Sequence, residues 1–463
     1  MAVVFVVIAL TVFVLAGFAH LYLWRRLVRD VSAPGSAWRR TGTVLAFVLP
    51  VVMIANVAVG RSGAPFTLQR VLAWPGYMWL ALLLYLLMAL AVGEAVRPLL
   101  RRALERRAAR GPGDAVLGAP AATSAADAVP APAGAVPGGT AATVTATRSE
   151  AGAGAASEAS EGSGDEPGER GGPAEPGEPG EPREQSPAVT SRRLFVARTV
   201  AAGAAVAAAG TVGAGAYNLL NGPTLKRVTV PLAKLPRAAH GYRIAVVSDI
   251  HLGTVLGRSH TERIVRTINS AQPDLVAIVG DLVDGSVADL GPAAEPLRRL
   301  RPRHGSFFVT GNHEYFGDAD EWVDHVRELG VHPLENARLE LPHFDLAGVN
   351  DLRGEDSGEG PDFEKALGDR DTSRTSVLLA HQPVQIHESV EYGVDLQLSG
   401  HTHGGQLFPF HLVVALANPT VAGLDRYGDT QLYVTRGAGA WGPPVRVGAD
   451  PDVTIVRLAS KQA

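Results

Sequence analysis

The sequence predicts an α/β domain of about 240 residues, at 222–463, behind an N-terminal region that spans a membrane. In the C-terminal half, short runs rich in Val, Ile and Leu alternate with polar segments of helical character, as strands and helices alternate in α/β domains. In the first hundred residues, long apolar runs are separated by Arg-rich joints. These two observations exclude a single compact soluble domain, although the whole chain averages 46% hydrophobic and 19% charged residues.

Residues 1–110 are expected to form a membrane domain with three transmembrane helices, at about 2–24, 43–60 and 71–93. Each run is near the ~20 residues that a helix needs to cross a bilayer. Buried core helices are the alternative, which the Arg-rich joints disfavour. Arg clusters follow the first and third runs, so the positive-inside rule places both clusters in the cytoplasm and the N-terminus outside.

Residues 111–190 consist mostly of Ala, Gly, Pro, Glu, Ser and Thr, which predicts a disordered linker. In the next segment, 191–221, the pair Arg192–Arg193 and Phe195 precede an uncharged stretch rich in Ala and Gly. This pattern resembles a twin-arginine export signal, which the twin-arginine translocase reads. An ordinary fourth transmembrane segment and a soluble Ala-rich helix are the alternatives. Signal and span both place the following domain outside the cytoplasm.

The composition of the chain excludes several kinds of partner and of functional site. A formal net charge of −4 implies no strongly basic face and argues against a nucleic-acid partner. The chain has no cysteine, which excludes disulfide frameworks, thiolate metal sites and cysteine nucleophiles. A metal site in this chain would therefore depend on Asp, Asn and His side chains.

Five predicted strands each end at a polar motif. The strands are expected at 242–248, 275–279, 306–310, 376–380 and 394–399. The motifs that follow them are Asp249-Ile250-His251, Gly280-Asp281 with Asp284, Gly311-Asn312-His313-Glu314, His381, and Gly400-His401-Thr402-His403. Open α/β sheets place their sites beyond the carboxyl ends of their strands. Carboxylate, amide and imidazole groups bind Mn, Fe, Zn or Ni, so the series predicts a metal site at this edge.

The series D-x-H, G-D-x-x-D, G-N-H-E, H and G-H-x-H, in this order, resembles the calcineurin-like metallophosphoesterase superfamily over the whole C-terminal domain. The extended GHTHGGQ motif, behind a membrane-associated N-terminus, is similar to the bacterial membrane-associated branch. The resemblance implies a four-layer αββα sandwich with a dinuclear metal centre at the loop edge of its two mixed sheets. With the expected topology, it implies a multi-pass protein of the bacterial cell membrane whose catalytic domain is extracytoplasmic.

The resemblance also implies which residues hold two divalent metal ions. Four side chains would bind the first ion: Asp249, His251, Asp281 and His403. Four would bind the second, with Asp281 shared between the ions: Asp281, Asn312, His381 and His401. Mn, Fe, Zn and Ni remain open as identities for the two ions.

Other positions follow from the same resemblance. His313 would contact the phosphate together with Asn312 and protonate the leaving oxygen, while Asp284 would orient His313. Glu314 is given no catalytic role. A hydroxide that bridges the two metals would attack phosphorus. Arg436 and Arg446 are potential phosphate partners for which a structural role is preferred, and Asp351 matches a recurrent family position.

The function expected from this resemblance is a membrane-anchored hydrolase of a phosphate ester or diphosphate, with a lipid-linked substrate as one candidate. A phosphodiesterase or phosphomonoesterase acting on a soluble extracytoplasmic substrate is the nearest alternative. A non-catalytic metal-binding scaffold is the alternative of another class, and the intact ligand set argues against it.

Overall fold

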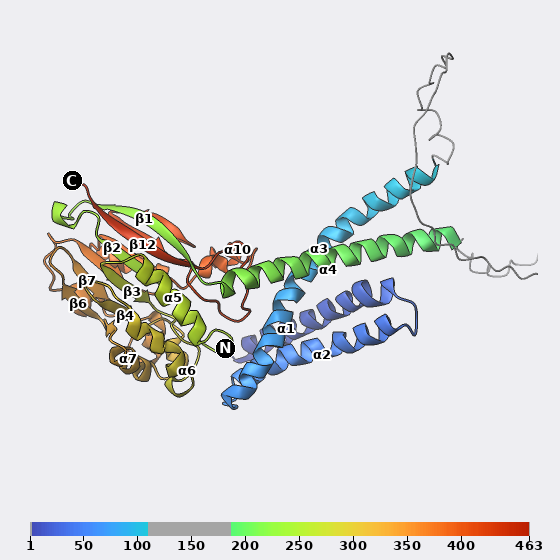
Figure 1. Ribbon diagram of the computed structural model, residues 1–463, viewed down its shortest axis with the longest axis horizontal. Coiled ribbons are helices and arrows are strands. Elements are labelled where there is room, and N and C mark those ends of the chain that lie inside the picture. The colour runs from blue at the N-terminus through green and yellow to red at the C-terminus, as the bar shows by residue number, and fades with distance from the viewer. Residues whose placement is uncertain (1, 110–186, 463) are drawn as a thin grey trace, which may run out of the picture. The chain divides into compact units, whose positions relative to one another are not determined.

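The computed structural model describes residues 2–109 and 187–462 (Figure 1). The described residues of 1–102 and 191–463 belong to one compact unit, and those at 103–109 and 187–190 belong to a second. The described parts of the second unit are the end of one helix and the first residues of the next. The linker predicted at 111–190 lies outside the described residues except for 187–190, which begin a helix.

Four long helices come from the N-terminal half of the chain: α1 (Ala2–Leu23), α2 (Ala37–Gly60), α3 (Phe66–Ala109) and α4 (Pro187–Leu220). Within the described residues, three helical segments are long and apolar enough to cross a membrane: Ala37–Gly60, Phe66–Arg106 and Arg192–Leu220. The helix α3 extends past the apolar run expected at 71–93, because the following residues are mainly Leu, Ala, Arg and Glu, which favour helix. The first expected span forms α1, and its crossing of a membrane stays a prediction.

The C-terminal part contains two six-stranded mixed sheets. The first sheet has the order β1-β12-β2-β3-β4-β5 and the second has the order β10-β11-β9-β8-β7-β6. The strands of the first sheet are β1 (Thr224–Leu232), β2 (Arg243–Val247), β3 (Leu275–Val279), β4 (Ser306–Val309), β5 (His332–Pro333) and β12 (Asp452–Ser460). Those of the second are β6 (Ala337–Glu340), β7 (Asp345–Gly348), β8 (Ser376–Leu379), β9 (Leu396–Ser399), β10 (Gly423–Tyr427) and β11 (Thr430–Val434).

The sheets pack face to face, with helices on their outer faces (Figure 1). These helices are α5 (Arg258–Ser270), α6 (Val287–Ala294), α7 (Ala319–Glu328), α8 (Phe363–Leu367) and α9 (Ile386–Glu391), while α10 (His411–Val414) lies at the loop end of the domain (Figure 1). The core between the sheets contains Ile244, Val246, Leu346 and Leu398, all fully buried. A second core, which includes Ile264 of α5, fills the space under the outer helices of the first sheet. The expected four-layer αββα sandwich is confirmed.

All five strands expected to carry motifs are present, as β2, β3, β4, β8 and β9. The strands β2, β3 and β4 run parallel in one sheet, and β8 and β9 run parallel in the other. Parallel neighbours end at the same edge of a sheet, so the five motifs are delivered to two adjoining edges.

Candidate metal centre

The structure brings the predicted ligand side chains into overlapping groups of potential metal ligands. In each group, one ligand atom per residue lies within 4.8 Å of the others. The groups are Asp249 with His251 and His403, Asp281 with His381 and His401, and His251 with Asp281 and His313. The first two groups contain six of the seven residues expected as ligands, and their division between two ions stays a prediction.

In the first group, three side chains from the loop after β2 and the loop after β9 converge. His251 Nε2 lies 3.0 Å from His403 Nε2, and His403 Nε2 lies 3.2 Å from Asp249 Oδ1. Asp249 also accepts hydrogen bonds from the backbone N–H of His401 at 3.1 Å, which joins the two loops. Two imidazole nitrogens and a carboxylate oxygen directed at one point form a donor set that suits a divalent cation.

In the second group, His381 Nε2 lies 3.2 Å from Asp281 Oδ2. The other ring nitrogen of His381 donates to the backbone oxygen of Val279 at 2.8 Å, which fixes the tautomer. Nε2 is buried, and its contact with the Asp281 carboxylate does not meet hydrogen-bond geometry. A buried imidazole nitrogen that faces a carboxylate in this way fits a pair of metal ligands. Asn312 Oδ1 joins the group 2.9 Å from His401 Nδ1.

The backbone at these positions is strained. Five non-glycine residues of the site have positive φ angles: Asp249 (51°), His251 (48°), Asp281 (52°), His401 (69°) and His403 (52°). Such conformations cost free energy and persist where the surrounding structure imposes them, as at functional sites. The turns after β2, β3 and β9 thus direct these side chains toward the site, and the strained backbone lowers the stability of the fold.

Asp284 links the first metal group to His313. Its Oδ1 atom lies 2.8 Å from His251 Nδ1 and 2.7 Å from His313 Nδ1. The sequence predicted the contact with His313 and missed the one with His251. Burial would raise the pKa of Asp284, but His251 and His313 lower it to about 2. Conversely, burial would lower the pKa of His251, and the Asp284 carboxylate raises it to about 9.

The remaining imidazoles differ in charge. Burial lowers the pKa of His403 to about 4, against the attraction of its carboxylate partner. Burial and the neighbouring His381 lower the pKa of His401 to about 4. Both rings are therefore neutral at pH 7, the form that binds a metal. Burial opposes protonation of His381 as well, but the Asp281 carboxylate raises its pKa well above the usual value.

Glu314 supports the loops rather than the ligands. Its buried carboxylate accepts hydrogen bonds from the backbone N–H groups of Asp281, Leu282, Val283 and Gly311, at 2.6–3.3 Å. Burial and the nearby Asp281 carboxylate raise its pKa to about 7, against the hydrogen bond from Gly311. No catalytic role was expected for Glu314, and the structure shows a structural role that no local sequence pattern signals.

Arg446 and Asp351 also have structural partners. Arg446 is 1% exposed and donates to the backbone oxygens of Gly439, His403 and Arg436. This is the structural role preferred from the sequence. Asp351 is buried and accepts from Gln382 Nε2 at 2.9 and 3.0 Å, beside the loop that carries His381.

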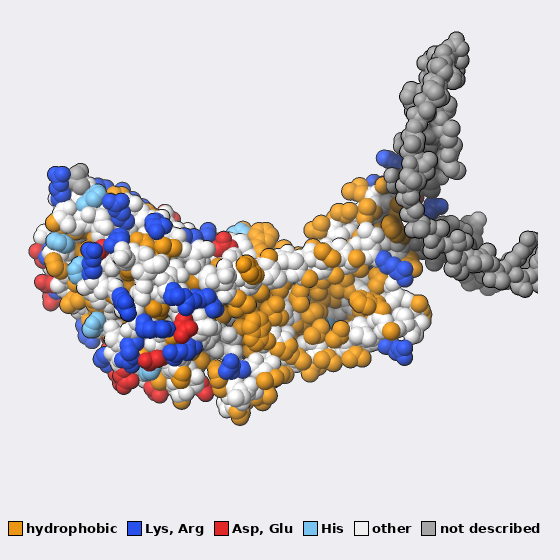
Figure 2. Space-filling model, viewed as in Figure 1, with side chains coloured by type: hydrophobic (Ala, Val, Ile, Leu, Met, Phe, Trp, Pro, Cys, Tyr) orange, Lys and Arg blue, Asp and Glu red, His pale blue; other side chains and the backbone are white. Residues whose placement is uncertain are grey.

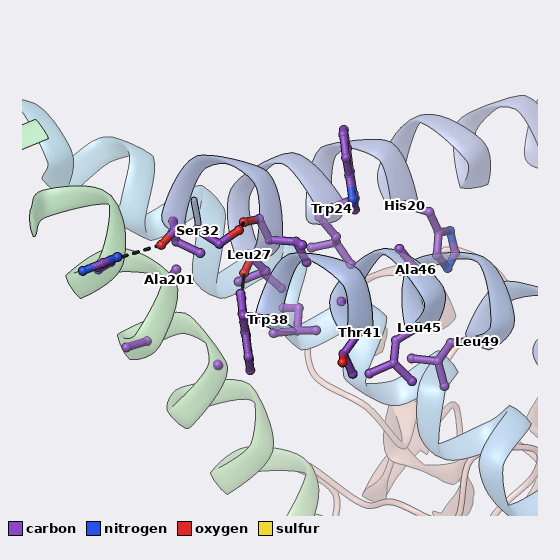
Figure 3. Close-up of a pocket in the computed structure, with 18 of the residues that line it drawn as sticks. His20, Trp24, Leu27, Ser32, Trp38, Thr41, Leu45, Ala46, Leu49 and Ala201 are labelled. Atoms are coloured by element: carbon purple, nitrogen blue, oxygen red, sulfur yellow. Dashed lines mark hydrogen bonds between the residues drawn. The ribbon is translucent and has the colours of Figure 1, made fainter. Parts of the chain in front are cut away.

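A cavity of about 810 Å³ lies among the four long helices (Figure 3). Its walls are mainly apolar and include Trp38, Leu45 and Leu49 of α2. His20 of α1 also lines it. Both ring nitrogens of His20 form hydrogen bonds: Nδ1 donates to Ala16 O at 2.7 Å, and Nε2 accepts from Trp79 Nε1 at 3.0 Å. None of the predicted metal ligands lines this cavity, so it is separate from the metal centre.

Comparison with known proteins agrees with this geometry. The Calcineurin-like phosphoesterase family matches residues 242–405. An "Uncharacterized metallophosphoesterase" of Aquifex aeolicus is 35% identical over 254 residues, which cover 53% of this chain and 97% of that protein. The chain belongs to the calcineurin-like phosphoesterase family.

Two further relatives have names that describe them as transmembrane proteins. A "Transmembrane protein with metallophosphoesterase domain" of Danio rerio is 40% identical over 264 residues, 53% of this chain and 60% of that protein. The protein of the same name from Bos taurus is 37% identical over 261 residues, 53% of this chain and 59% of that protein. The match thus spans about 60% of the length of these relatives. The predicted superfamily is confirmed, and the bacterial branch stays a prediction.

Proposed function

We propose that this chain is a membrane-anchored, metal-dependent hydrolase of a phosphate ester or diphosphate. The observation that carries the proposal is the meeting of six Asp and His side chains in two groups, with Asn312 2.9 Å from His401 and the His313–Asp284 pair beside them. The seven proposed ligands are Asp249, His251, Asp281, Asn312, His381, His401 and His403.

The donor set fits two divalent cations, because it joins carboxylates, an amide oxygen and imidazoles with nitrogens free to coordinate. Bound there, two cations would neutralise phosphoryl charge and lower the pKa of a water molecule, so that hydroxide is available at neutral pH to attack phosphorus. Asp281 stands between the two groups and also accepts the backbone N–H of His313 at 2.9 Å. It therefore places His313 relative to both metal positions.

His313 is the proposed general acid. Its Nδ1 donates to Asp284, which leaves Nε2 to donate to a leaving oxygen. The hydrogen bond to Asp284 holds the ring in one orientation. Asn312, the residue before His313, would contact the phosphate as well as the second ion.

An extracytoplasmic position of the catalytic domain belongs to the same proposal. Lys and Arg side chains gather at the ends of the long helices away from the αββα domain, and apolar side chains cover the length between (Figure 2). The positive-inside rule would place those basic ends in the cytoplasm. A phosphatase site on the outer face of a membrane would meet lipid-linked phosphate esters. Use of the twin-arginine translocase at Arg192–Arg193 remains part of this proposal, without a structural observation behind it.

The test is a substrate screen of the purified full-length chain, stripped of metal and reloaded with defined ions. We expect Mn²⁺-loaded protein to hydrolyse bis-p-nitrophenyl phosphate and the metal-stripped protein to lose that activity. Equal activity in both states would contradict the proposal. Phospholipids and nucleotide-linked lipids in the same screen separate a lipid-linked substrate from a soluble one. A reporter fused to the C-terminus tests the topology, and a cytoplasmic signal would contradict it.

A further inference from the structure

The membrane helices contribute to a cavity that reaches the metal centre. This cavity, of about 110 Å³, is lined on one side by Asn56 of α2 and by Gln69 and Tyr77 of α3. On the other side it is lined by His251 and Asp284, together with the loops 253–256 and 440–444. A metal ligand and its carboxylate partner thus share a cavity with residues of two helices that are apolar enough to span a membrane.

The helix α3 is docked on the catalytic domain along its first half. Phe66, its first residue, packs against the core beneath the outer helices of the first sheet. The Tyr77 ring lies 3.8 Å from the position that a Cβ atom would take at Gly442. Tyr85 Oη donates to the backbone oxygen of Phe408 at 3.1 Å. From Phe66 to Tyr85 these contacts extend over nearly 30 Å of helix, at 1.5 Å per residue. The helix α3 therefore packs against the catalytic domain and lines one side of the cavity.

The turn at 441–443, which Tyr77 approaches, is hydrogen-bonded to the loop that carries His401 and His403. Gln406, the last residue of GHTHGGQ, donates to the backbone oxygens of Trp441 and Pro443 at 2.9 and 3.1 Å, and accepts from Trp441 N at 3.0 Å. The Trp441 ring is 5.9 Å from the His313 ring and 58% exposed. Trp441 therefore lies beside His313 and directly before Gly442, the residue that the Tyr77 ring approaches.

The segment after GHTHGGQ is apolar and exposed. Its exposed side chains are Phe408, Phe410, Leu412, Val413 and Leu416, at 46–87% of their full area. A cluster of this kind is unusual on a water-facing surface and marks a binding surface. Phe408 accepts a hydrogen bond from Tyr85 of α3, a helix long and apolar enough to cross a membrane, so a lipid surface is the partner that fits this segment.

We propose that Tyr77 is a substrate-positioning residue of the phosphoesterase site, and that the site takes amphiphilic phosphate esters whose apolar part remains in the membrane. The inference rests on the proposed function and adds the substrate class. Tyr and Trp have amphipathic rings that suit the membrane–water interface. The Tyr77 ring would contact the start of the apolar chain where it leaves the site for the lipids, while the phosphate lies beside His313.

The test compares two esters with one leaving group, butyl p-nitrophenyl phosphate and hexadecyl p-nitrophenyl phosphate. In each, water adds to phosphorus, the bond to the nitrophenyl oxygen breaks, and p-nitrophenol and the alkyl phosphate are released. The enzyme is the full-length, Mn²⁺-loaded chain in nanodiscs. We expect Tyr77→Ala to raise KM for the hexadecyl ester about tenfold, the scale of one lost aromatic contact, and to leave kcat/KM for the butyl ester within about twofold.

Two further variants sharpen this comparison. Tyr77→Phe keeps the ring and should retain the preference for the long chain. Tyr217→Ala removes a tyrosine of α4 that is 71% exposed, and should leave both esters unchanged. Equal effects of Tyr77→Ala on both esters, or none on either, would overturn the inference while the proposed function stands. Hydrolysis of neither ester by the wild-type chain would overturn both.

A crosslinking experiment tests whether α3 lines the cavity, and it leaves Tyr77 in place. Because the chain has no cysteine, Gln69→Cys and Val255→Cys introduce two thiols that line the same cavity from the two sides. We expect a short bis-maleimide to join them within one chain in protein that still hydrolyses the butyl ester. Efficient labelling of both thiols without crosslinking would overturn the inference.

Discussion

Asp284 accepts a 2.7 Å hydrogen bond from His313 through Oδ1, the same atom that lies 2.8 Å from His251 Nδ1. One carboxylate oxygen thus holds a proposed metal ligand and the proposed general acid. Metal affinity and proton transfer are coupled through this atom, because any shift of the carboxylate moves both rings.

Asp284→Asn tests this coupling. The amide can accept only weakly at the same place and carries no charge, so both rings lose orientation. We expect metal affinity or turnover to fall by about 10–100-fold, as for other residues that orient metal ligands. Titration with Mn²⁺ and steady-state kinetics measure the two effects. Asp356→Asn, at an exposed surface ion pair, serves as the matched control. Loss of turnover with unchanged Mn²⁺ affinity would show that Asp284 acts on His313 alone.

His313→Ala separates proton transfer from metal binding. The variant retains all seven proposed ligands, so Mn²⁺ affinity should stay close to that of the wild type. Turnover should fall by about 10²–10⁴-fold, and most for a poor leaving group that needs a proton. Kinetics on an alkyl ester and on a p-nitrophenyl ester make the comparison. If the variant cleaves the alkyl ester as fast as the wild type does, the general-acid role is wrong.

Glu314→Gln tests the structural carboxylate. Glutamine offers one acceptor oxygen in place of two, so buried backbone N–H groups of the loop at 281–283 or of Gly311 lose their partner. Each unsatisfied group costs about 1–3 kcal/mol of the free energy of unfolding. Denaturant unfolding of the metal-free protein measures the loss. Glu388→Gln in α9 is the control substitution, and an equal stability change in both variants would contradict the assignment.

Proton release on metal binding follows from the raised pKa of His251. In the metal-free protein this value is about 9, above the unfolded value of about 6.5. Its protonation therefore contributes stability that is complete below pH 6.5 and is lost as pH rises through 9. A metal ion must displace that proton, and it must also displace the proton that the raised pKa of His381 retains. We expect Mn²⁺ to release protons at pH 7.5 and fewer above pH 9.

Calorimetry in two buffers of different ionisation enthalpy counts these protons. Asp284→Asn should reduce the number released at pH 7.5, because the asparagine no longer raises the pKa of His251. A release that does not change between pH 7 and 10 would contradict the assignment.

The proposed metal ligands could be predicted from the sequence, whereas the residues that support or flank them could not. Each ligand directly follows a strand that its own Val, Ile and Leu residues predict, and parallel strands end together, so the meeting of Asp249 with His403 follows from local pattern and sheet geometry. The role of Glu314 does not, because its hydrogen bonds reach backbone some 30 residues away. The proximity of Tyr77 to Asp284 depends on the docking of α3, which no local signal encodes.

Helix ends were predicted less well than strand ends. The helix α4 begins at Pro187, four residues before the expected 191, because proline fits the first turn of a helix. The helix α3 continues to Ala109 through residues that favour helix without being apolar. Hydropathy locates the apolar part of a helix and leaves its polar extension unmarked.

Gly280→Ala tests whether the turn after β3 is crowded as well as left-handed. Gly280 has φ +78°, and an added Cβ would lie 2.5 Å from His381 Nδ1. Gly330, after α7, has nearly the same φ (+81°) with open space at its Cβ position. Gly330→Ala should therefore cost only the left-handed strain, about 1–2 kcal/mol. Gly280→Ala should cost more in thermal or denaturant unfolding, and should also weaken Mn²⁺ binding, because His381 must move. Equal costs with unchanged Mn²⁺ affinity would show that His381 is not held by this close approach.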